Sequence, residues 1–494
     1  MMNTTPYAPT ALDRATRGAL ALSMCALLCA CAVGPDYKRP DIAVPAAYKE
    51  LPGWTQADPN AALAPKGQWW QAFHDPLLDE LEPQVEGSNQ TVRQRYANYQ
   101  QALAEVNVAR GALFPTLGLT SSATRQRSAT ASRIVNSGTL EGSASWDLDL
   151  WGKVRRSIEE NQATAQADEA LLANAVLSEQ TALATTIVEL RTTDANIDLL
   201  QQTVAADQES LRVVENQSRA GTTPPSDLMT ARVQLESAQS SLIALGVARA
   251  QYAHAIAVLV GKNPEDLDIP HNPQLPDLPQ VPVGVPSTLL QRRPDIAAAE
   301  RQMAAQNAAI GVAVAAFYPE ISLSALDGFA QSPLTGLVRA ANRIWSLGAN
   351  ASMTLFDGGT RSATVQAARA GYDATVANYR GVVLGALQGV EDNLAGLRIL
   401  ARQADVLNRA VADSIRGTQI ALNEYRAGTV DYTTVATAQT AQLNNQQALL
   451  NVEQQRRLTM VSLIGNLGGG WSTDKLQSSA PSTNPNAKQL TLKQ

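Results

Sequence analysis

An internal repeat restricts the fold of this 494-residue chain more than any other feature of its sequence. Arg219-Ala220-Gly221-Thr222 recurs as Arg426-Ala427-Gly428-Thr429, which sets an offset of 207 residues. The repeat predicts two similar halves, 75–263 and 287–470, joined by a proline-rich connector over 264–286. Whatever structure one half forms, the other half is expected to form again.

Each half contains two candidate strands. The stretches 143–150 and 345–355 alternate strictly between apolar and polar residues, so each strand would have one apolar and one polar face. Their partners, 116–126 and 320–331, alternate less cleanly. About ten residues in a tilted strand suffice to cross a hydrocarbon core. A soluble hairpin is the alternative, but it needs another sheet over its apolar face, and no further strands are evident.

Four strands per chain are too few to close a barrel. The smallest membrane barrels have about eight strands and are filled by their own side chains. After residue 31 the sequence suggests no helical membrane span, so a crossing would require strands in a closed barrel. Several copies would then share one barrel, and strand counting favours three copies with twelve strands over two copies with eight.

The predicted helices carry a coiled-coil signature. Apolar residues at intervals of seven would form a seam along each helix and impose a left-handed supercoil. These residues are Val176, Leu183, Leu190, Ile197, Val204 and Leu211 in the first half, and Val383, Val390, Leu397, Ala404 and Val411 in the second. The helical stretches 152–218 and 358–425 would each be about 100 Å long. Solvent-exposed structural coiled coils are the alternative, but the direct attachment to amphipathic strands favours a continuous wall from membrane to periplasm.

The N-terminal sequence has the pattern of an export signal. Arg14 and Arg17 precede a short apolar run that ends at Cys31, and Leu28-Cys29-Ala30-Cys31 resembles the lipobox of bacterial lipoproteins. We therefore predict a signal peptide over 1–30, lipid attachment at Cys31 and a lipidated segment over 31–74. Cleavage would leave Cys31 as the only cysteine, which excludes a disulfide framework. The alternative is a soluble secreted protein with an incidental cysteine.

Composition and motifs argue against an enzyme or a nucleic-acid-binding protein. The net charge is −6 and no basic run with interleaved aromatics is present. The three histidines are scattered and no metal, nucleophile or phosphate-loop motif occurs, so we expect no catalytic residue, cofactor or metal. Arg292-Arg293-Pro294-Asp295 has paired charges, but proline and an acidic residue there predict the start of a helix. The polar segment 471–494 is predicted to be a tail.

Several longer motifs resemble those of the TolC-like outer-membrane factors, in particular the NodT-type efflux lipoproteins. These motifs are Cys31-Ala32-Val33-Gly34-Pro35-Asp36-Tyr37, Trp69-Trp70, Asp75-Pro76-Leu77, Leu289-Leu290-Gln291-Arg292-Arg293-Pro294-Asp295-Ile296, Phe317-Tyr318-Pro319, Leu355-Phe356-Asp357-Gly358-Gly359 and Gly468-Gly469-Gly470-Trp471. The resemblance implies an α+β membrane protein: a homotrimer whose twelve-stranded β-barrel is continuous with a twelve-helix α-barrel, built from two repeats per chain. It also implies a lipid-anchored outer-membrane location that extends into the periplasm.

The function that this resemblance implies is that of an exit duct. Such a duct belongs to a tripartite efflux pump and passively conducts small molecules, with a periplasmic adaptor and an inner-membrane transporter as partners. Two alternatives stay open: the exit duct of a type I protein secretion system, and a non-conducting coiled-coil tether between membranes.

The resemblance also implies an aperture at the periplasmic end. Asp227 matches a family aperture aspartate and Tyr425 a gate tyrosine, both beside the repeated turns. Thr437 and Thr440 stand where many members carry an aspartate and an arginine, so the gate would rest on fewer bonds. The simpler alternative is that Asp227 only stabilises the start of the helix after Pro224-Pro225.

We predict that Cys31→Ser gives a foldable protein whose membrane attachment is less secure, because the barrel and the lipid are separate membrane signals. Membrane fractionation and extraction with increasing salt would show the weaker attachment. Failure to recover any assembled protein from the variant would contradict the prediction.

Overall fold

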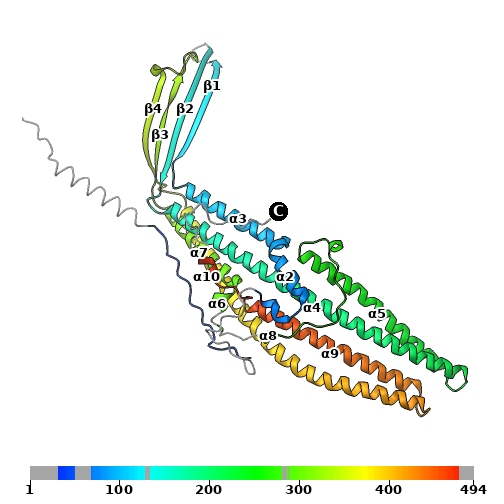
Figure 1. Cartoon of the computed structure of the whole chain (residues 1–494). Coiled ribbons are helices and arrows are strands. Elements are labelled where there is room, and N and C mark those ends of the chain that lie inside the picture. Colours follow the sequence, from blue (N-terminus) through cyan, green and yellow to red (C-terminus); the bar gives the residue numbers. More distant parts are fainter. Residues whose placement is uncertain (1–31, 51–67, 128–133, 281–285, 287–288, 478–494) are drawn as a thin grey trace, which may run out of the picture. The chain divides into compact units, whose positions relative to one another are not determined.

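The computed structural model describes residues 32–50, 68–127, 134–280, 286 and 289–477. Figure 1 shows its succession of helices and strands. η1 (Trp69–Phe73) precedes the first half, whose elements are α2 (Pro76–Ser88), α3 (Gln90–Gly111), β1 (Thr116–Arg127), β2 (Ile134–Leu148), α4 (Lys153–Arg219) and α5 (Pro225–Leu259); η2 (Pro264–Asp266) lies in the connector. The elements of the second half are α6 (Leu289–Arg292), α7 (Pro294–Ala315), β3 (Glu320–Gln331), η4 (Ala340–Asn342), β4 (Arg343–Ser352), α8 (Thr360–Arg426) and α9 (Tyr432–Asn466), and α10 (Asp474–Gln477) follows it.

The two halves use elements of matching length in the same order. The helices α4 and α8 each contain 67 residues, and α5 and α9 each contain 35. The four strands lie where the alternation predicted them, but only β3 has the predicted bounds, and β1 ends one residue later than predicted, at Arg127. β2 begins nine residues before the predicted start. Gly138 and Gly142 interrupt its apolar row, so the alternation in the sequence did not reveal this part of the strand. β4 ends at Ser352, before the predicted end at residue 355.

The chain divides into two compact units. The first contains residues 1–41, 99–168 and 299–379, and therefore the whole sheet. All its strand pairs are antiparallel and their order is β1-β2-β3-β4, so β1 and β4 form the two edges.

The register of the sheet separates its two faces. Leu117 lies opposite Ala144, Ala144 opposite Ala325 and Ala325 opposite Leu347, so apolar side chains align across all four strands. On the other face hydroxyl groups pair across β1 and β2, for example Ser122 with Thr139, whose oxygens are 2.9 Å apart. The predicted division into an apolar and a polar face is confirmed.

Each long helix is fixed where it leaves the sheet. Asp149 accepts hydrogen bonds from the backbone N–H groups of Val154 and Arg155 and pairs with the Arg155 guanidinium at 3.1 Å. Asp357 does the same for α8, accepting from the N–H of Arg361 and pairing with its guanidinium at 2.6 Å. A carboxylate at a helix N-terminus satisfies free N–H groups and complements the helix dipole.

At the other junctions the helices end before aromatic-proline pairs. α3 ends at Gly111, before Phe114-Pro115, and β1 begins at Thr116. α7 ends at Ala315, before Tyr318-Pro319, and β3 begins at Glu320. Proline disfavours a helical residue before it, so each helix gives way to a strand there.

An N-terminal strap, defined as residues 32–41, packs against helices of the same unit. Asp36 pairs with Arg156 at 2.7 Å, the Asn307 amide donates to the Pro35 carbonyl at 2.9 Å, and the Tyr37 hydroxyl donates to Glu300 at 2.5 Å. The strap comes so close to α7 that a Cβ on Gly34 would lie 2.5 Å from the Cα of Gly311. This contact therefore requires glycine.

The second unit contains residues 42–98, 169–298 and 380–494, and its helices bury the predicted coiled-coil seam. Leu183, Leu190 and Val390 are fully buried, and Val383 and Leu397 are nearly so. The seam prediction is confirmed for these residues and for Ala404. The other predicted seam residues are half-buried: Val176, Ile197, Val204, Leu211 and Val411. The helix start predicted at Arg292-Arg293-Pro294-Asp295 is also correct, because α7 begins at Pro294.

Ion pairs hold other segments of this unit against α4. Arg191 and Asp75 form a buried pair at 2.9 Å, which fixes the segment that precedes α2. Asp194 is fully buried and pairs with Arg249 at 2.7 Å, while His271 of the connector lies 2.7 Å from Asp198. The connector is thus anchored to α4 and α5.

The sequence suggested no helical membrane span after residue 31, but two helices meet the compositional criteria for one. Two described helices, α4 and α5, contain an 18-residue window apolar enough to cross a membrane by composition. Their alanine-rich coiled-coil composition explains this. Only 11% of the window in α5 is buried within the chain, so much of that apolar surface has no partner within the described residues.

Candidate functional site

The structure brings two of the three predicted site residues into one cluster. Asp227 and Tyr425 both lie in the second unit, beside the turns that join α4 to α5 and α8 to α9. The third, Cys31, and the predicted signal peptide lie outside the described residues.

The repeated Arg-Ala-Gly-Thr motifs form these two turns. Gly221 and Gly428 adopt positive φ angles of 70° and 74°. Beyond each glycine a threonine N–H donates to a carbonyl five residues earlier, from Thr222 to Gln217 and from Thr429 to Glu424, both at 3.0 Å. This is the Schellman helix ending, in which glycine adopts a left-handed conformation at little cost.

Asp227 is the third residue of α5 and is only 4% exposed. Its carboxylate accepts a hydrogen bond from the Thr223 hydroxyl at 2.8 Å and a longer one from the N–H of Tyr432 at 3.5 Å. The first bond stabilises the turn before α5. The second reaches the start of α9, so Asp227 also contacts the other hairpin.

Tyr425 connects the same two hairpins from α8. Its hydroxyl donates to the Gln217 side-chain oxygen at 2.5 Å, and its ring meets the Tyr432 ring edge-on at a centroid distance of 5.5 Å. Burial raises the pKa of the Tyr425 phenol, and the nearby Asp227 carboxylate adds to the rise. Asp227 and Tyr425 therefore share a cluster, although no hydrogen bond joins the two side chains directly.

A buried polar network next to this cluster was missed in the sequence. Asp207 is 2% exposed and accepts from the Gln234 amide at 3.2 Å, while its second oxygen has no partner within the described residues. Gln234 also donates to Gln439 at 3.1 Å, and Gln439 donates to Ser210 at 3.3 Å. The network therefore joins α4, α5 and α9.

The signal for this network was present in the heptad pattern. Asp207 falls between Val204 and Leu211, at the second core position of its heptad, where an apolar residue is expected. Burial raises the pKa of its carboxyl group from about 3.8 to about 6, against a smaller opposing effect of the Gln234 hydrogen bond. A carboxyl group in a coiled-coil seam therefore identifies a buried titratable site.

Thr437 and Thr440 make no bond across the hairpins. Their hydroxyls donate to carbonyls of their own helix, to Thr433 and Ala436 respectively, both at 2.8 Å. Longer charged side chains at these positions could have reached partners beyond their own helix.

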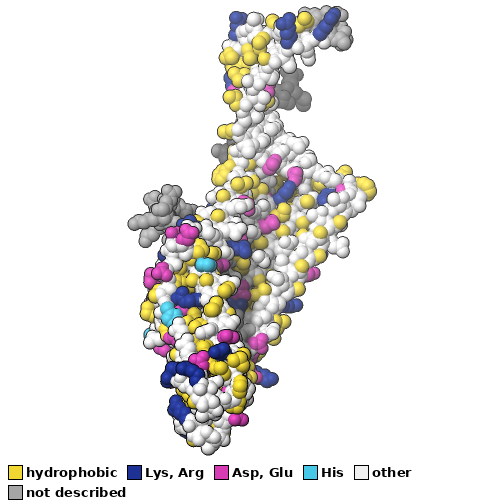
Figure 2. Space-filling view, turned by 90° about the vertical axis from the view of Figure 1, so that its right-hand side faces the viewer, with side chains coloured by type: hydrophobic (Ala, Val, Ile, Leu, Met, Phe, Trp, Pro, Cys, Tyr) yellow, Lys and Arg dark blue, Asp and Glu magenta, His cyan; other side chains and the backbone are white. Residues whose placement is uncertain are grey.

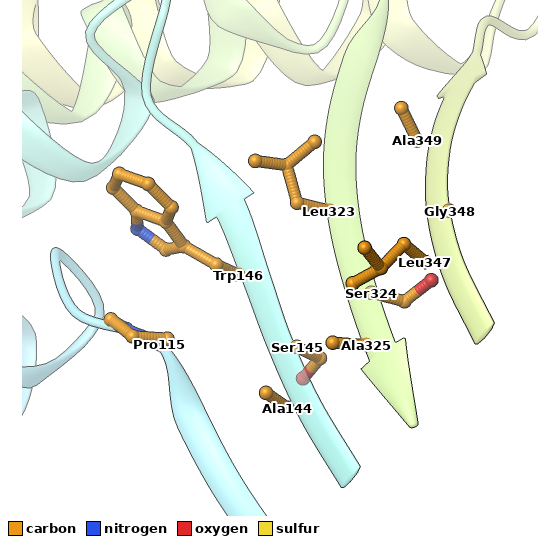
Figure 3. Close-up of a pocket in the computed structure, with 10 residues that line it drawn as sticks. All are labelled: Pro115, Ala144, Ser145, Trp146, Leu323, Ser324, Ala325, Leu347, Gly348 and Ala349. Atoms are coloured by element: carbon orange, nitrogen blue, oxygen red, sulfur yellow. The ribbon is translucent and has the colours of Figure 1, made fainter. Parts of the chain in front are cut away.

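The apolar face of the sheet is the second candidate site. Leu117 and Leu347 are 82% and 76% exposed within the chain. A hollow of about 490 Å³ lies on this face. Figure 3 shows two of its lining residues, Trp146 and Leu323, on adjacent strands. An exposed apolar face of this extent is typical of a surface that contacts lipid.

No described group of three or more histidine, cysteine, aspartate or glutamate side chains could hold a metal ion.

Comparison with known proteins identifies the family. A sequence model described as "Outer membrane efflux protein" matches residues 81–262 and 285–469, most of the chain and both of its halves. The chain belongs to the outer membrane efflux protein family. The resemblance to the TolC-like factors and the outer-membrane location are thereby confirmed.

Individual relatives agree over nearly the whole length. The solvent efflux pump outer membrane protein SrpC of Pseudomonas putida is 31% identical over 463 residues, covering 91% of this chain and 97% of the relative. The outer membrane protein OprJ of Pseudomonas aeruginosa is 29% identical and covers 92% and 96%. Among solved structures, the outer-membrane channel OprN superposes with a TM-score of 0.82 at 31% identity, covering 89% of this chain and all of that one.

The buried carboxyl group of Asp207 predicts a pH-dependent stability. Because its folded pKa is raised, it favours the folded state at pH 4 and loses that contribution as pH rises through about 6. Asp207→Asn should therefore be more stable than the parent at pH 7.5, by about 1–3 kcal/mol, and the difference should shrink towards pH 4.

Thermal midpoints of the purified protein, measured between pH 4 and 8, would test this. Asp79→Asn is the matched control, because Asp79 is exposed on α2. Parallel curves for the parent and Asp207→Asn over this range would contradict the prediction.

Proposed function

We propose that three copies of this chain form one exit duct of a tripartite efflux pump, with twelve strands in the outer membrane and twelve helices in the periplasm. The duct passively conducts small molecules that an inner-membrane transporter delivers through a periplasmic adaptor. Several relatives carry efflux pump names, such as the toluene efflux pump outer membrane protein TtgC of Pseudomonas putida. The chain itself supplies no catalysis in this proposal.

The observation that carries the proposal is the pair of open edges of the sheet. β1 pairs only with β2, and β4 only with β3, among the described strands. In hydrocarbon each unpaired N–H or C=O group costs several kcal/mol, so both edges need partners. Pairing β4 of one copy with β1 of the next satisfies both edges with a single repeated contact. Three copies close twelve strands around an open lumen.

Exposed apolar side chains on the helices support lateral assembly. Ile399, Val406 and Ile420 on α8 follow heptad spacing and are each about half exposed or more. Ile243 and Val247 on α5 are 76% and 62% exposed. Such stripes outside the seam already buried within the chain fit packing against a neighbouring copy.

The N-terminal strap supports lipid attachment at Cys31. Ala32, the next residue, lies so close to Gly152 that a Cβ on that glycine would be 2.7 Å from the Ala32 side chain. Gly152 lies between β2 and α4, so Ala32 lies at the end of the sheet at which α4 begins.

In this proposal the Asp227 and Tyr425 cluster controls the periplasmic aperture. It lies at the turns, where hydrogen bonds from Tyr425 to Gln217 and from Tyr432 to Asp227 join the two hairpins of one copy. Thr437 and Thr440 bond within α9, so they add nothing that joins the hairpins. A few buried polar contacts would therefore keep the aperture narrow.

We expect the detergent-solubilised particle to have about three times the 52.5 kDa mass of the chain, slightly less after signal removal. In planar bilayers it should give discrete single-channel currents. A folded monodisperse monomer would exclude the shared barrel, whereas an assembled particle that never passes current would favour the membrane tether.

We predict that Asp227→Ala combined with Tyr425→Phe raises single-channel conductance and weakens cation preference. The double variant removes the hydrogen bond to Gln217 and a carboxylate near the aperture, while the Phe ring can still pack against Tyr432. Assembly should persist, because the apolar seam is unchanged.

Asp79→Ala with Tyr96→Phe is the matched control, since it removes the same groups on α2 and α3, away from the turns. Conductance and selectivity equal to those of the parent in the Asp227 and Tyr425 variant would leave Asp227 with only its role in the turn.

A further inference from the structure

We propose that arginines at the outer end of the sheet bind phosphate groups of a glycolipid in the outer leaflet of the membrane. Arg125, Arg127, Arg339 and Arg343 are together called the arginine collar below. All four are exposed, and Figure 2 shows Lys and Arg side chains gathered at this end of the sheet. The proposal rests on the duct proposed above for the position of the sheet in the membrane and for the contacts between copies.

The collar continues the apolar rows of the two edge strands. Because side chains alternate along a strand, the outward row of β1 runs Leu117, Leu119, Ser121, Ala123, Arg125 and Arg127. The outward row of β4, followed in the same direction across the membrane, runs Ala351, Ala349, Leu347, Trp345 and Arg343. Both rows thus change from apolar side chains to arginine on the face that meets lipid.

The position of the change matches the thickness of a membrane. Eight residues separate Leu117 from Arg125 and Ala351 from Arg343, about 26 Å along a strand and about 20 Å in height at a tilt of ~40°. The apolar band of an outer-membrane barrel is about 25 Å tall. Arginine facing lipid is costly at the midplane and costs little near the interface, so these positions belong to the headgroup level. Trp345, 69% exposed beside Arg343, has the amphipathic ring typical of that level.

The collar has more positive charge than the sheet neutralises. Arg343 pairs with Asp327 at 2.9 Å. The guanidinium groups of Arg125, Arg127 and Arg339 form no hydrogen bond or ion pair within the described part of the chain. Glu141 is the neighbouring acidic residue on β2, but it pairs with Thr120 and so faces the polar side of the sheet. Three guanidinium groups therefore remain free for an outside anion.

Closure of the barrel would concentrate this charge. β1 and β4 are opposite edges of one sheet, so each contact between copies brings Arg125 and Arg127 of one copy to the edge that carries Arg343 of the next. Like charges on adjacent strands repel each other unless an anion lies between them. A barrel of three copies would thus contain three such sites.

Phosphate is the anion that best fits this surface. A guanidinium group donates two parallel hydrogen bonds to a phosphate and keeps its charge at all physiological pH values. The acyl chains of a phosphorylated glycolipid would lie along the apolar rows below the arginines. The periplasmic direction of the helices places the collar in the outer leaflet, where such glycolipids are found.

Native mass spectrometry of the purified full chain with lipid A carrying two phosphates would test the proposal. We expect Arg125→Gln with Arg127→Gln to lose at least tenfold in affinity for this lipid. Arg125→Lys with Arg127→Lys should fall between this variant and the parent, because lysine keeps the charge without the paired donors. Dephosphorylated lipid A should bind the parent no more tightly than it binds the glutamine variant.

The control removes two positive charges elsewhere, as Arg95→Gln with Lys262→Gln, and should bind lipid A like the parent. If the β1 variants do not assemble, Arg339→Gln in the loop before β4 tests the same claim with a smaller expected loss. The proposal would be overturned if the parent and the β1 glutamine variant bound lipid A equally well. It would also be overturned if the parent bound lipid A equally well with and without its phosphates. The same spectra give the number of chains in the particle, so a failed trimer is distinguished from a failed lipid site.

Discussion

The unpaired backbone at the two edges of the sheet is the constraint on which the proposed architecture depends. A four-stranded sheet with an apolar face can enter a membrane only if β1 and β4 find further strands, because lipid offers no hydrogen bonds. Closure by copies of the same chain turns the apolar face outward and the hydroxyl-rich face inward. The same strand register therefore produces both the polar lumen and the lipid-facing wall.

The helical unit has a different requirement, because an aperture has to open without loss of the fold. Its seam is apolar at Leu183, Leu190 and Val390, which are fully buried. Nearer the turns, a polar network of Asp207, Gln234 and Gln439 lies beside a second buried apolar cluster, which includes Val214, Tyr432 and Val435. Apolar contacts tolerate little displacement, whereas hydrogen bonds of buried polar groups can be exchanged for water if the helices separate. The polar network is therefore the part of this region whose bonds water can replace when the helices separate.

Periodicity in the sequence predicted the elements, because strands and coiled coils have different and sustained periods. The period of two located four strands, and the period of seven located α4 and α8 to within two residues of their ends. The bounds of β2 were wrong because Gly138 and Gly142 carry no apolar side chain to continue the pattern. Pattern alone could not show that Asp227 bonds to Thr223, or that Tyr425 bonds to Gln217, since these contacts depend on how two hairpins pack. Asp207 could have been found, because a carboxyl group at a core heptad position violates the pattern.

The junctions between strands and helices explain why motion at the turns need not disturb the sheet. Asp149 and Asp357 each bind the first N–H groups of a 67-residue helix and an arginine of its first turn. Fraying of that first turn would release a carboxylate, an arginine and two or more backbone donors at once. The polar network near the turns consists of side-chain hydrogen bonds between helices, and one oxygen of Asp207 has no partner within the described residues. The bonds at each helix start lie within one segment of the chain, whereas those near the turns join different helices, so separation of the hairpins breaks the second set and leaves the first intact.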